Sequence, residues 1–518
     1  MLPEVKKSTY EILEEGVGAE VDRIESREKK NLIFQLRVRN TSNKSIRIFS
    51  FVVAEFVIPN KIEKVLEHGW LQCSEVSWKT LDEPTQEIRM FLQRDQNHYS
   101  FKKEYGYVEN SIVSEWFTLV KMYGEDLFIG AVTTADQFTQ IFVKSEGGGT
   151  RIKVTCQYDG LILNPGQVVK SEKIFFAIGE ESKIKKDFAE SLAKHMNVKK
   201  VAPPIRAMCN SYYWNANKIS DEIINNELNA IERMPERLNL DYFELDAGYT
   251  RYFGDWLDYK DRFPMGFEPI IKRIKSLGYK PALWISPFAI SPATKLHDHH
   301  ASWLLKGDHK KHFEGRWTSP VDNLSNDIDL EVLDPTNDEV KKYLKGVLTH
   351  FMDLGFELFN TDFMYPVCLA EKYSKPVTRA QALREGVQFI RDTVGPLKLK
   401  SCITQLSPMV GLIDYVRTGI DTLNPFVCAI PGVNRMVNDF MLEKNIRESQ
   451  ERLFLNGIVW NADPDVLVFR DGTGIDESVI NQHKKMAKDN NMSLWFGDSV
   501  AKMDNLTKEK ILKFYNNV

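Results

Sequence analysis

The sequence predicts an N-terminal antiparallel β-sandwich over residues 1–198, followed by a (β/α)8 barrel over residues 199–518. Three observations lead to this fold class. The chain has 518 residues, which is too many for one compact core. Up to about residue 180, apolar and polar residues alternate in short runs, as in antiparallel sheets. After residue 204, short apolar runs alternate with helical patterns, which is typical of parallel sheets.

The composition excludes several classes of partner. Of the residues, 43% are hydrophobic and 27% charged, and the formal net charge of -4 gives no reason to expect a nucleic acid or an anionic membrane. No apolar run approaches the roughly 18 residues of a membrane helix, and the start of the chain lacks the apolar segment of a secretory signal. The six cysteines have neither CxxC pairing nor zinc-ligand spacing. We therefore expect a reduced, cytoplasmic protein.

The first part of the chain contains several candidate strands separated by turn residues. Turns are indicated by "GGG" at 147–149 and "NPGQ" at 164–167. The pattern "KIKKDFAESLAKHM" (183–196) predicts a helix, and "KKVAPP" (199–204) a linker. The candidate strands include "NLIFQLRVRN" (31–40), "SIRIFSFVVAEF" (45–56), "WFTLVKMYG" (116–124), "DLFIGAVTT" (126–134) and "RIKVTCQY" (151–158).

The second part contains eight candidate strands with helical patterns between most of them. A helix is predicted over 267–277, another over 338–354 with Thr336 and Glu339 as its capping box, and a last one over about 507–516. Eight such units predict a (β/α)8 barrel. A doubly wound open sheet is the alternative, although no GxGxxG turn follows the first strand. The strands are 206–212, 240–246, 280–286, 356–361, 397–403, 415–420, 456–460 and 492–496.

Acidic and aromatic residues gather where these strands end, and barrel enzymes carry their chemistry there. Asp362 follows the apolar strand 356–361, and Pro366 then ends any strand pairing. Sugar hydrolysis needs two carboxyl groups, and aromatic faces pack against the sugar ring. One such acid alone would be read as a helix cap, and one tryptophan as core, but several at one edge predict a site. The aromatic candidates are Tyr212, Trp214, Trp256, Trp284 and Trp460.

Several motifs, in order, resemble those of the retaining α-galactosidases of glycoside hydrolase family 36, which are related to family 27. The resemblance covers about residues 150 to 518, and it implies that the family's usual C-terminal β-domain is absent here. The motifs are "YDGLILNPGQVVKSEKIFFAIGE", "YFELDAGY", "FGDW", "RFPMGFEPIIKRIKSLGYKPALWISP", "LEVLDPTNDEVKKYLKGVL", "LFNTDF", "GLIDYVRTGID", "WNADPDVLVFRD" and "LTKEKILKFY".

The resemblance implies a retaining double displacement with Asp362 as nucleophile and Asp421 as general acid/base. Arg417 would bind a sugar hydroxyl or orient a carboxylate. The resemblance and the strand ends together imply further substrate-binding residues: Asp246 for hydroxyls of the glycone, Cys402 at the sugar's 2-position side, and Tyr212, Trp256 and Trp284 as aromatic contacts.

Two positions depart from the family pattern. The chain has "DAG" where "DDG" is expected, so Ala247 removes an acceptor for sugar hydroxyls. It has Asn360 where "K-x-D" has lysine, which removes a cation two residues before Asp362. Because a site built to pair a hydroxyl discriminates strongly, these changes predict an altered choice of glycone.

Other functions stay open at this point. The same scaffold would serve an α-N-acetylgalactosaminidase or a transglycosylase, and a non-catalytic carbohydrate-binding protein is a different class. "ADPD", with Asp463 and Asp465, either orients the site from the seventh strand or is simply a turn, and we favour the turn. We expect a small carbohydrate as substrate, no cofactor or metal, and self-association as a cover for the barrel. A metal-dependent hydrolase would need ligands from His297, His299, His300, His309 and His312.

Overall fold

The computed structural model describes residues 7–12, 18–58, 62–85, 107–209, 218–307, 330–424 and 432–517. The chain folds into two compact units. The first contains Met1–Lys200 together with Lys375–Arg384 and Gln405–Gly411, and the second contains Val201–Ser374, Glu385–Thr404 and Leu412–Val518. Among the described residues, none of the helices combines the length and apolar character needed to cross a bilayer.

The first unit is rich in antiparallel sheet, as predicted. One sheet has the strand order β1-β4-β11-β10-β7, and the other has the order β12-β3-β13-β9-β8-β5-β6 with β2 paired to β3. The strands are β1 (Lys7–Ile12), β2 (Ala19–Glu28), β3 (Asn31–Asn40), β4 (Ile46–Ile58), β5 (Ile62–His68), β6 (Val76–Lys79), β7 (Ile112–Glu115), β8 (Phe117–Met122), β9 (Asp126–Ala131), β10 (Thr139–Glu146), β11 (Gly149–Leu163), β12 (Val168–Lys170) and β13 (Ile174–Gly179).

Aromatic side chains fill the core of this unit. Phe176 of β13 contacts Phe56 of β4, so the two sheets share buried side chains. Helix α1 (Glu181–His195) inserts Phe188 against Phe128 of β9, with ring centroids 4.7 Å apart. Gly130 makes room for it, since a Cβ there would lie 2.7 Å from the Phe188 ring. The helix predicted at 183–196 is therefore confirmed, although it begins two residues earlier, at Glu181.

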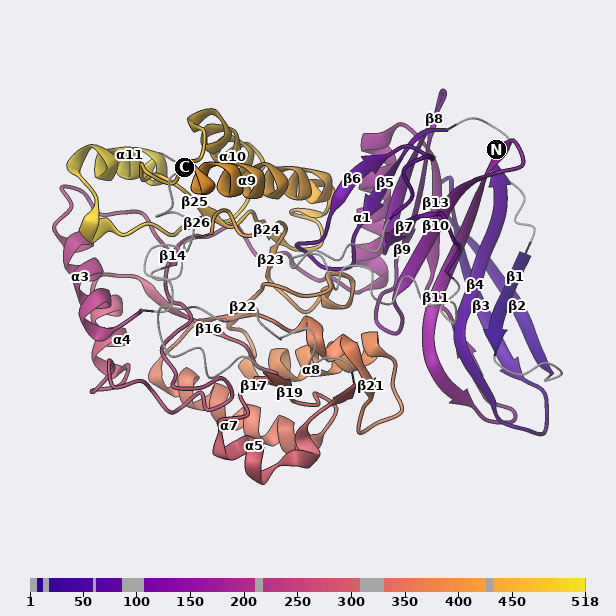
Figure 1. The fold of residues 1–518 in the computed structure, drawn as a ribbon, viewed down its shortest axis with the longest axis horizontal. Helices are drawn as coiled ribbons and strands as arrows, with labels where there is room; N and C mark the ends of the chain where they lie inside the picture. Colours follow the sequence, from indigo (N-terminus) through magenta and orange to yellow (C-terminus); the bar gives the residue numbers. More distant parts are fainter. Residues whose placement is uncertain are drawn as a thin grey trace. The chain divides into compact units, whose positions relative to one another are not determined.

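The second unit is built on a nine-stranded sheet in the order β24-β23-β22-β20-β16-β15-β14-β26-β25. All of its strand pairs are parallel. Figure 1 shows the helices of this unit lying outside the strands. The strands are β14 (Arg206–Cys209), β15 (Tyr242–Leu245), β16 (Lys280–Ile285), β20 (Leu358–Thr361), β22 (Lys398–Ser401), β23 (Tyr415–Arg417), β24 (Asn461–Asp463), β25 (Val466–Leu467) and β26 (Leu494–Phe496).

The helices follow the predicted apolar faces, although two caps differ from prediction. Asn337, not Thr336, caps α7, because its side chain accepts from the Glu339 N–H at 2.9 Å. The last helix begins at Asn505, two residues before Thr507, and Asp504 caps it. The helices are α3 (Asp221–Glu232), α4 (Glu268–Ser276), α5 (Lys295–His299), α7 (Asp338–Leu354), α8 (Arg379–Val394), α9 (Val433–Arg452), α10 (Glu477–Asp489) and α11 (Asn505–Asn516).

The seventh strand is the one whose predicted position is wrong. Residues 456–460 form a turn in which Val459 N donates to Leu455 O, and the strand follows as β24 and β25. Pro464 and Asp465 interrupt it; Asp465 has a φ of +73°. Of the apolar run that suggested a strand, Val459 and Trp460 are buried in this turn, whereas Gly457 is exposed.

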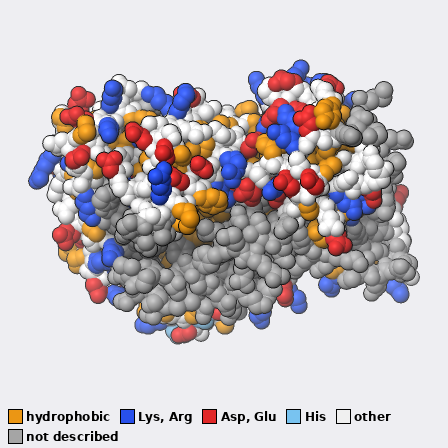
Figure 2. Space-filling model, turned by 45° about the horizontal axis from the view of Figure 1, so that its top comes forward, with side chains coloured by type: hydrophobic (Ala, Val, Ile, Leu, Met, Phe, Trp, Pro, Cys, Tyr) orange, Lys and Arg blue, Asp and Glu red, His pale blue; other side chains and the backbone are white. Residues whose placement is uncertain are grey.

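Two pairs of very short strands lie beside the main sheet. They are β17 (Ala289–Ile290) with β19 (Glu331–Val332), and β18 (Lys306–Gly307) with β21 (Ala370–Lys372). On the described surface that Figure 2 presents, acidic and basic side chains are interspersed rather than gathered by sign. That distribution agrees with the small net charge of -4.

Candidate active site

One pocket lies at the carboxyl ends of the parallel strands, with a cavity volume of about 60 Å³. Of the predicted residues, Asp246, Trp284, Asn360, Asp362, Cys402, Arg417 and Asp421 line it. The strands of a parallel sheet end at a common edge, which is why residues distant in sequence meet here. Asp362 follows β20, Asp246 follows β15, and Asp421 follows β23.

Asp362 is buried and held by fixed donors. Its Oδ2 accepts from Trp284 Nε1 at 3.0 Å, and its Oδ1 accepts from Phe363 N at 2.7 Å. Phe363 has a φ of +49°, a left-handed conformation that directs its N–H to the carboxylate. Burial raises the pKa of Asp362 to about 6, while the two donors and the charge of Arg417 act to lower it.

Arg417 resolves a question that the sequence left open. Its Nη2 donates to Asp421 Oδ1 at 2.5 Å, so the guanidinium pairs directly with Asp421. Its Nη1 lies 3.3 Å from Asp465 Oδ1 and donates to Cys402 Sγ at 3.1 Å. Cys402, which follows β22, and Asp465, which follows β24, therefore hold the Arg417 side chain in place. Arg417 can thus orient Asp421 before any substrate binds.

The loop that carries Asp421 is fixed on both sides of that residue. Ile420 N donates to Glu448 Oε2 at 2.9 Å, and Thr422 N donates to Asp465 Oδ2 at 2.7 Å. Asp465 lines the pocket as well. The interpretation of "ADPD" as a simple turn is therefore corrected: this segment supplies a buried carboxylate that orients both Arg417 and the Asp421 loop.

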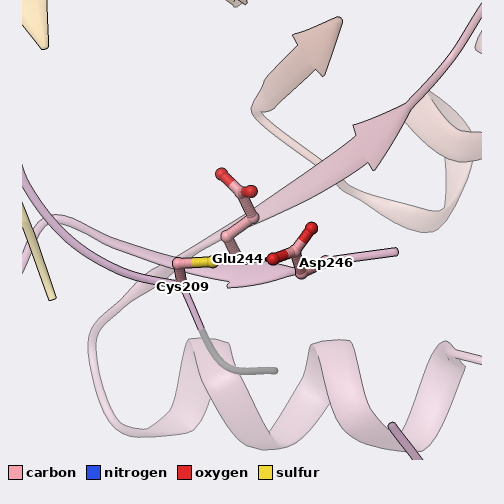
Figure 3. Close-up of side chains that lie close together, drawn as sticks. All are labelled: Cys209, Glu244 and Asp246. Atoms are coloured by element: carbon pink, nitrogen blue, oxygen red, sulfur yellow. Dashed lines mark hydrogen bonds between the residues drawn. The ribbon is translucent and has the colours of Figure 1, made fainter. Parts of the chain in front are cut away.

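Cys209, Glu244 and Asp246 form a tight group on β14 and β15, with ligand atoms within 4.8 Å of one another (Figure 3). Cys209 Sγ donates to Asp246 Oδ2 at 2.8 Å, and Ala247 N donates to Asp246 Oδ1 at 2.7 Å. Burial raises the pKa of the Cys209 thiol well above its usual value, so the sulfur keeps its proton. Both carboxyl oxygens of Asp246 thus accept a hydrogen bond from the protein.

Glu244, Asn360 and Lys400 lie deeper in the same pocket. Asn360 Nδ2 donates to Glu244 Oε1 at 2.9 Å. Lys400 Nζ lies 2.8 Å from Asp463 Oδ2 and 3.5 Å from the centre of the Trp495 ring. Burial raises the pKa of Glu244 to about 8, and the charge of Lys400 opposes that shift. We call Glu244, Asn360 and Lys400 the pocket floor.

Two members of the floor, Glu244 and Lys400, were not predicted from the sequence. Side chains alternate along a strand, so residues two apart share a face. Glu244 stands two residues before Asp246, and Lys400 two residues before Cys402, on the faces that carry those predicted residues. That spacing was the available signal.

The remaining predicted residues have different locations. Trp256 is buried behind Trp284, with ring centroids 6.2 Å apart, and it is not among the residues that line the pocket. Tyr212 lies outside the described residues. His297, His299 and His300 are in or next to α5, and His309 and His312 lie outside the described residues.

Comparisons with known proteins agree with the motifs. Residues 185–356 match the melibiase family model. The α-galactosidase AgaA of Geobacillus stearothermophilus is 28% identical over 105 residues, which are 19% of this chain and 14% of that protein. An α-galactosidase of Escherichia coli is 31% identical over 91 residues, which are 16% of this chain and 13% of that protein. This chain therefore covers less than a fifth of the length of either relative.

A solved structure is similar over nearly the whole chain. The α-galactosidase TtGalA from Thermus thermophilus, in complex with p-nitrophenyl α-D-galactopyranoside, has a TM-score of 0.68 at 18% identity. The match covers 95% of this chain and 94% of that one. At this identity the likeness concerns the fold. Together with the family match, it confirms the relation predicted from the motifs.

Proposed function

We propose that this chain, a relative of the α-galactosidase-type glycoside hydrolases of family 36, is a retaining α-glycosidase that removes terminal α-galactosyl residues from small oligosaccharides or glycosides. The observation that carries the proposal is the pair Asp362 and Asp421 in one pocket, each held by directed donors. Paired carboxyl groups at such a site are what glycoside hydrolysis requires. The relatives named above are α-galactosidases.

We propose further that residues 199–518 form a closed (β/α)8 barrel beside a β-sandwich of residues 1–198. Lys400 of β22 contacts the ring of Trp495 on β26, five places away in the strand order. In a flat sheet that separation would be about 24 Å. Ser493 N also donates to Ala462 O, which links the chain before β26 to β24. Both contacts favour a closed sheet over an open one.

In the proposed mechanism, Asp362 attacks the anomeric carbon as a carboxylate while Asp421 gives its proton to the leaving oxygen. The glycosyl–Asp362 ester then forms. Asp421 next removes a proton from water, and the water oxygen displaces Asp362 with net retention. With a pKa of about 6, Asp362 is ionised at neutral pH, and Trp284 and Phe363 direct their N–H groups at it.

The lining of the pocket favours a neutral galactoside. Apart from the protonated Glu244 and the proton donor Asp421, three acids line it, Asp246, Asp362 and Asp465, against the two cations Lys400 and Arg417. An anionic glycone would be repelled. Cys402, expected at the 2-position side, lines the pocket and accepts a hydrogen bond from Arg417 Nη1. Because the relatives named above are α-galactosidases, we favour galactosides over N-acetylgalactosaminides.

The test is hydrolysis of a panel of aryl glycosides: the α-galactoside, α-N-acetylgalactosaminide, α-glucoside and β-L-arabinopyranoside. Wild type is compared with Asp362→Ala, with and without azide. We expect turnover of the α-galactoside, its loss in the variant, and its return with azide, which replaces the missing carboxylate. Nuclear magnetic resonance of the first sugar released should give the α-anomer.

Asp498→Ala is the matched control, because Asp498 is also a buried acid just after a strand but does not line the pocket. Azide should leave its activity unchanged. If wild type turns over nothing on the panel while sugars still bind, a non-catalytic carbohydrate-binding protein replaces the proposal. Transfer of the glycosyl group to an added sugar acceptor, in preference to water, would instead identify a transglycosylase.

A further inference from the structure

The pocket floor carries buried polar atoms that have no hydrogen-bond partner among the described residues. Glu244 Oε2 and Asn360 Oδ1 are both buried without a hydrogen bond among the described residues. Both side chains line the pocket, and they are joined to each other by the Asn360 Nδ2–Glu244 Oε1 bond. An unpaired buried polar atom is costly unless a ligand satisfies it. The two free atoms therefore indicate a binding surface for polar groups.

Lys400 completes this surface with a fixed cation. It occupies the position on β22 that pairs in register with Asn360 on β20. Asp463 and the Trp495 ring hold its ammonium group from one side, and the side chain still lines the pocket. A lysine ammonium has three donors, so one remains for a ligand.

The pocket floor includes one of the two positions where this chain departs from the family pattern, and the other position lines the same pocket. Ala247 and Asn360 both line the pocket, and both are smaller than the aspartate and lysine expected there. The acid and the cation are instead present at Glu244 and Lys400.

We propose that Glu244, Asn360 and Lys400 determine glycone specificity by binding hydroxyl groups of a neutral pyranose at carbons other than C1. This inference rests on the proposed function for its substrate class. Glu244 accepts from or donates to a hydroxyl through Oε2, Asn360 accepts through Oδ1, and Lys400 donates. With its pKa raised to about 8, the Glu244 carboxyl carries a proton at neutral pH and is able to donate.

The test measures which hydroxyls matter, with and without the floor. Wild type, Glu244→Met and Lys400→Met are compared on an aryl α-galactoside and its 2-, 3-, 4- and 6-deoxy analogues. Hydrogen bonds to charged groups correspond to about a 10- to 150-fold preference. We expect wild type to discriminate against at least one deoxy analogue by that factor in kcat/KM. The variants should lose this discrimination at that position and keep it at the others.

Matched controls separate recognition from stability. Glu227→Gln changes a buried glutamate of α3, and Lys398→Met changes a lysine of β22 paired with Asp414; neither residue lines the pocket. Both should keep the wild-type pattern of discrimination. If Lys400→Met does not fold, Glu244→Met, which is similar in length but has no strong hydrogen-bonding group, decides alone. A wild-type pattern in the floor variants overturns the inference.

A binding measurement keeps this inference distinct from the proposed hydrolysis. Calorimetric titration with galactose and the four deoxygalactoses requires no turnover. If Asp362→Ala leaves activity unchanged, or no glycoside is hydrolysed, the mechanism fails while the binding pattern still decides the floor. If hydrolysis holds and the deoxy pattern is the same in every protein, only the floor assignment fails. A wild type that binds none of the sugars overturns the floor as well.

Discussion

Replacing Asp362 by asparagine should stabilise the protein progressively as the pH rises. The carboxyl group is buried, and its pKa is raised from 3.8 to about 6. The folded protein therefore holds the proton more tightly than the unfolded chain does. Ionised Asp362 opposes folding, and the variant removes that opposition.

The magnitude follows from the pKa difference of about 2 units, since 6 minus 3.8 is 2.2. Each unit corresponds to about 1.36 kcal/mol, so the ionised group costs about 3 kcal/mol. Below pH 3.8 both states are protonated and the cost is absent; it grows between pH 4 and 6 and is complete above that. The asparagine amide NH2 would also face one of the two donors, Trp284 Nε1–H or Phe363 N–H. Losing that hydrogen bond should lower the free energy of unfolding by about 1 kcal/mol at every pH.

Urea unfolding of wild type and Asp362→Asn at intervals from pH 4 to 7.5 measures this directly. The free energy of unfolding of the variant, relative to wild type, should rise by about 3 kcal/mol across that range. Asp338→Asn, an exposed change on α7, controls for the loss of one negative charge. A difference that stays flat, or falls with pH, would refute the argument that burial dominates the environment of Asp362.

Three further results are expected. In wild type, kcat/KM for an aryl α-galactoside should fall about tenfold per pH unit below the Asp362 pKa of about 6; a pH-independent rate down to pH 5 would exclude Asp362 as the ionised nucleophile. Lys400→Met should lower the free energy of unfolding in urea by about 3–5 kcal/mol, because it leaves the buried carboxylate of Asp463 unpaired. Lys398→Met, which removes a more exposed ion pair, should lower it by less than about 1 kcal/mol. Equal losses in the two variants would contradict this expectation. Gly419→Ala should lower kcat about 100-fold, because the added Cβ would lie 2.9 Å from Asn445 O and would shift Asp421, two residues later. Circular dichroism should show that the fold is retained. An unchanged kcat would show that the loop adjusts to the added methyl group.

The rim of the pocket was predictable because its residues break a local pattern. Asp246, Asp362 and Asp421 follow apolar segments at points where strands end, and the structure brings all three into one pocket. Whether each serves the role that the resemblance implies is a matter for the experiments above. The four helices that the sequence predicted, at 183–196, 267–277, 338–354 and about 507–516, were predictable for a similar reason, since each carries an apolar face. Their caps, in contrast, depend on single side chains.

The seventh strand shows where local pattern fails. "GIVW" is as apolar as a strand, yet it packs in a turn, and the paired residues come after it. Nothing local distinguishes burial in a turn from burial in a sheet. Asp465 was misread for the same reason: its role depends on Arg417, which is 48 positions earlier in the chain and cannot be located from the sequence around "ADPD".

The pocket floor required still more information than the rim. A lysine or glutamate within a strand is usually read as a solvated side chain, and only its partners change that reading. Glu244 pairs with Asn360 across the intervening strand β16, and Lys400 pairs with Asp463 across β23. Such contacts exist only once curvature brings non-adjacent strands within reach of one another. Part of the pocket floor therefore lies outside the motifs: Glu244 and Asn360 stand within "YFELDAGY" and "LFNTDF", whereas Lys400 belongs to none of the motifs that resemble the family's.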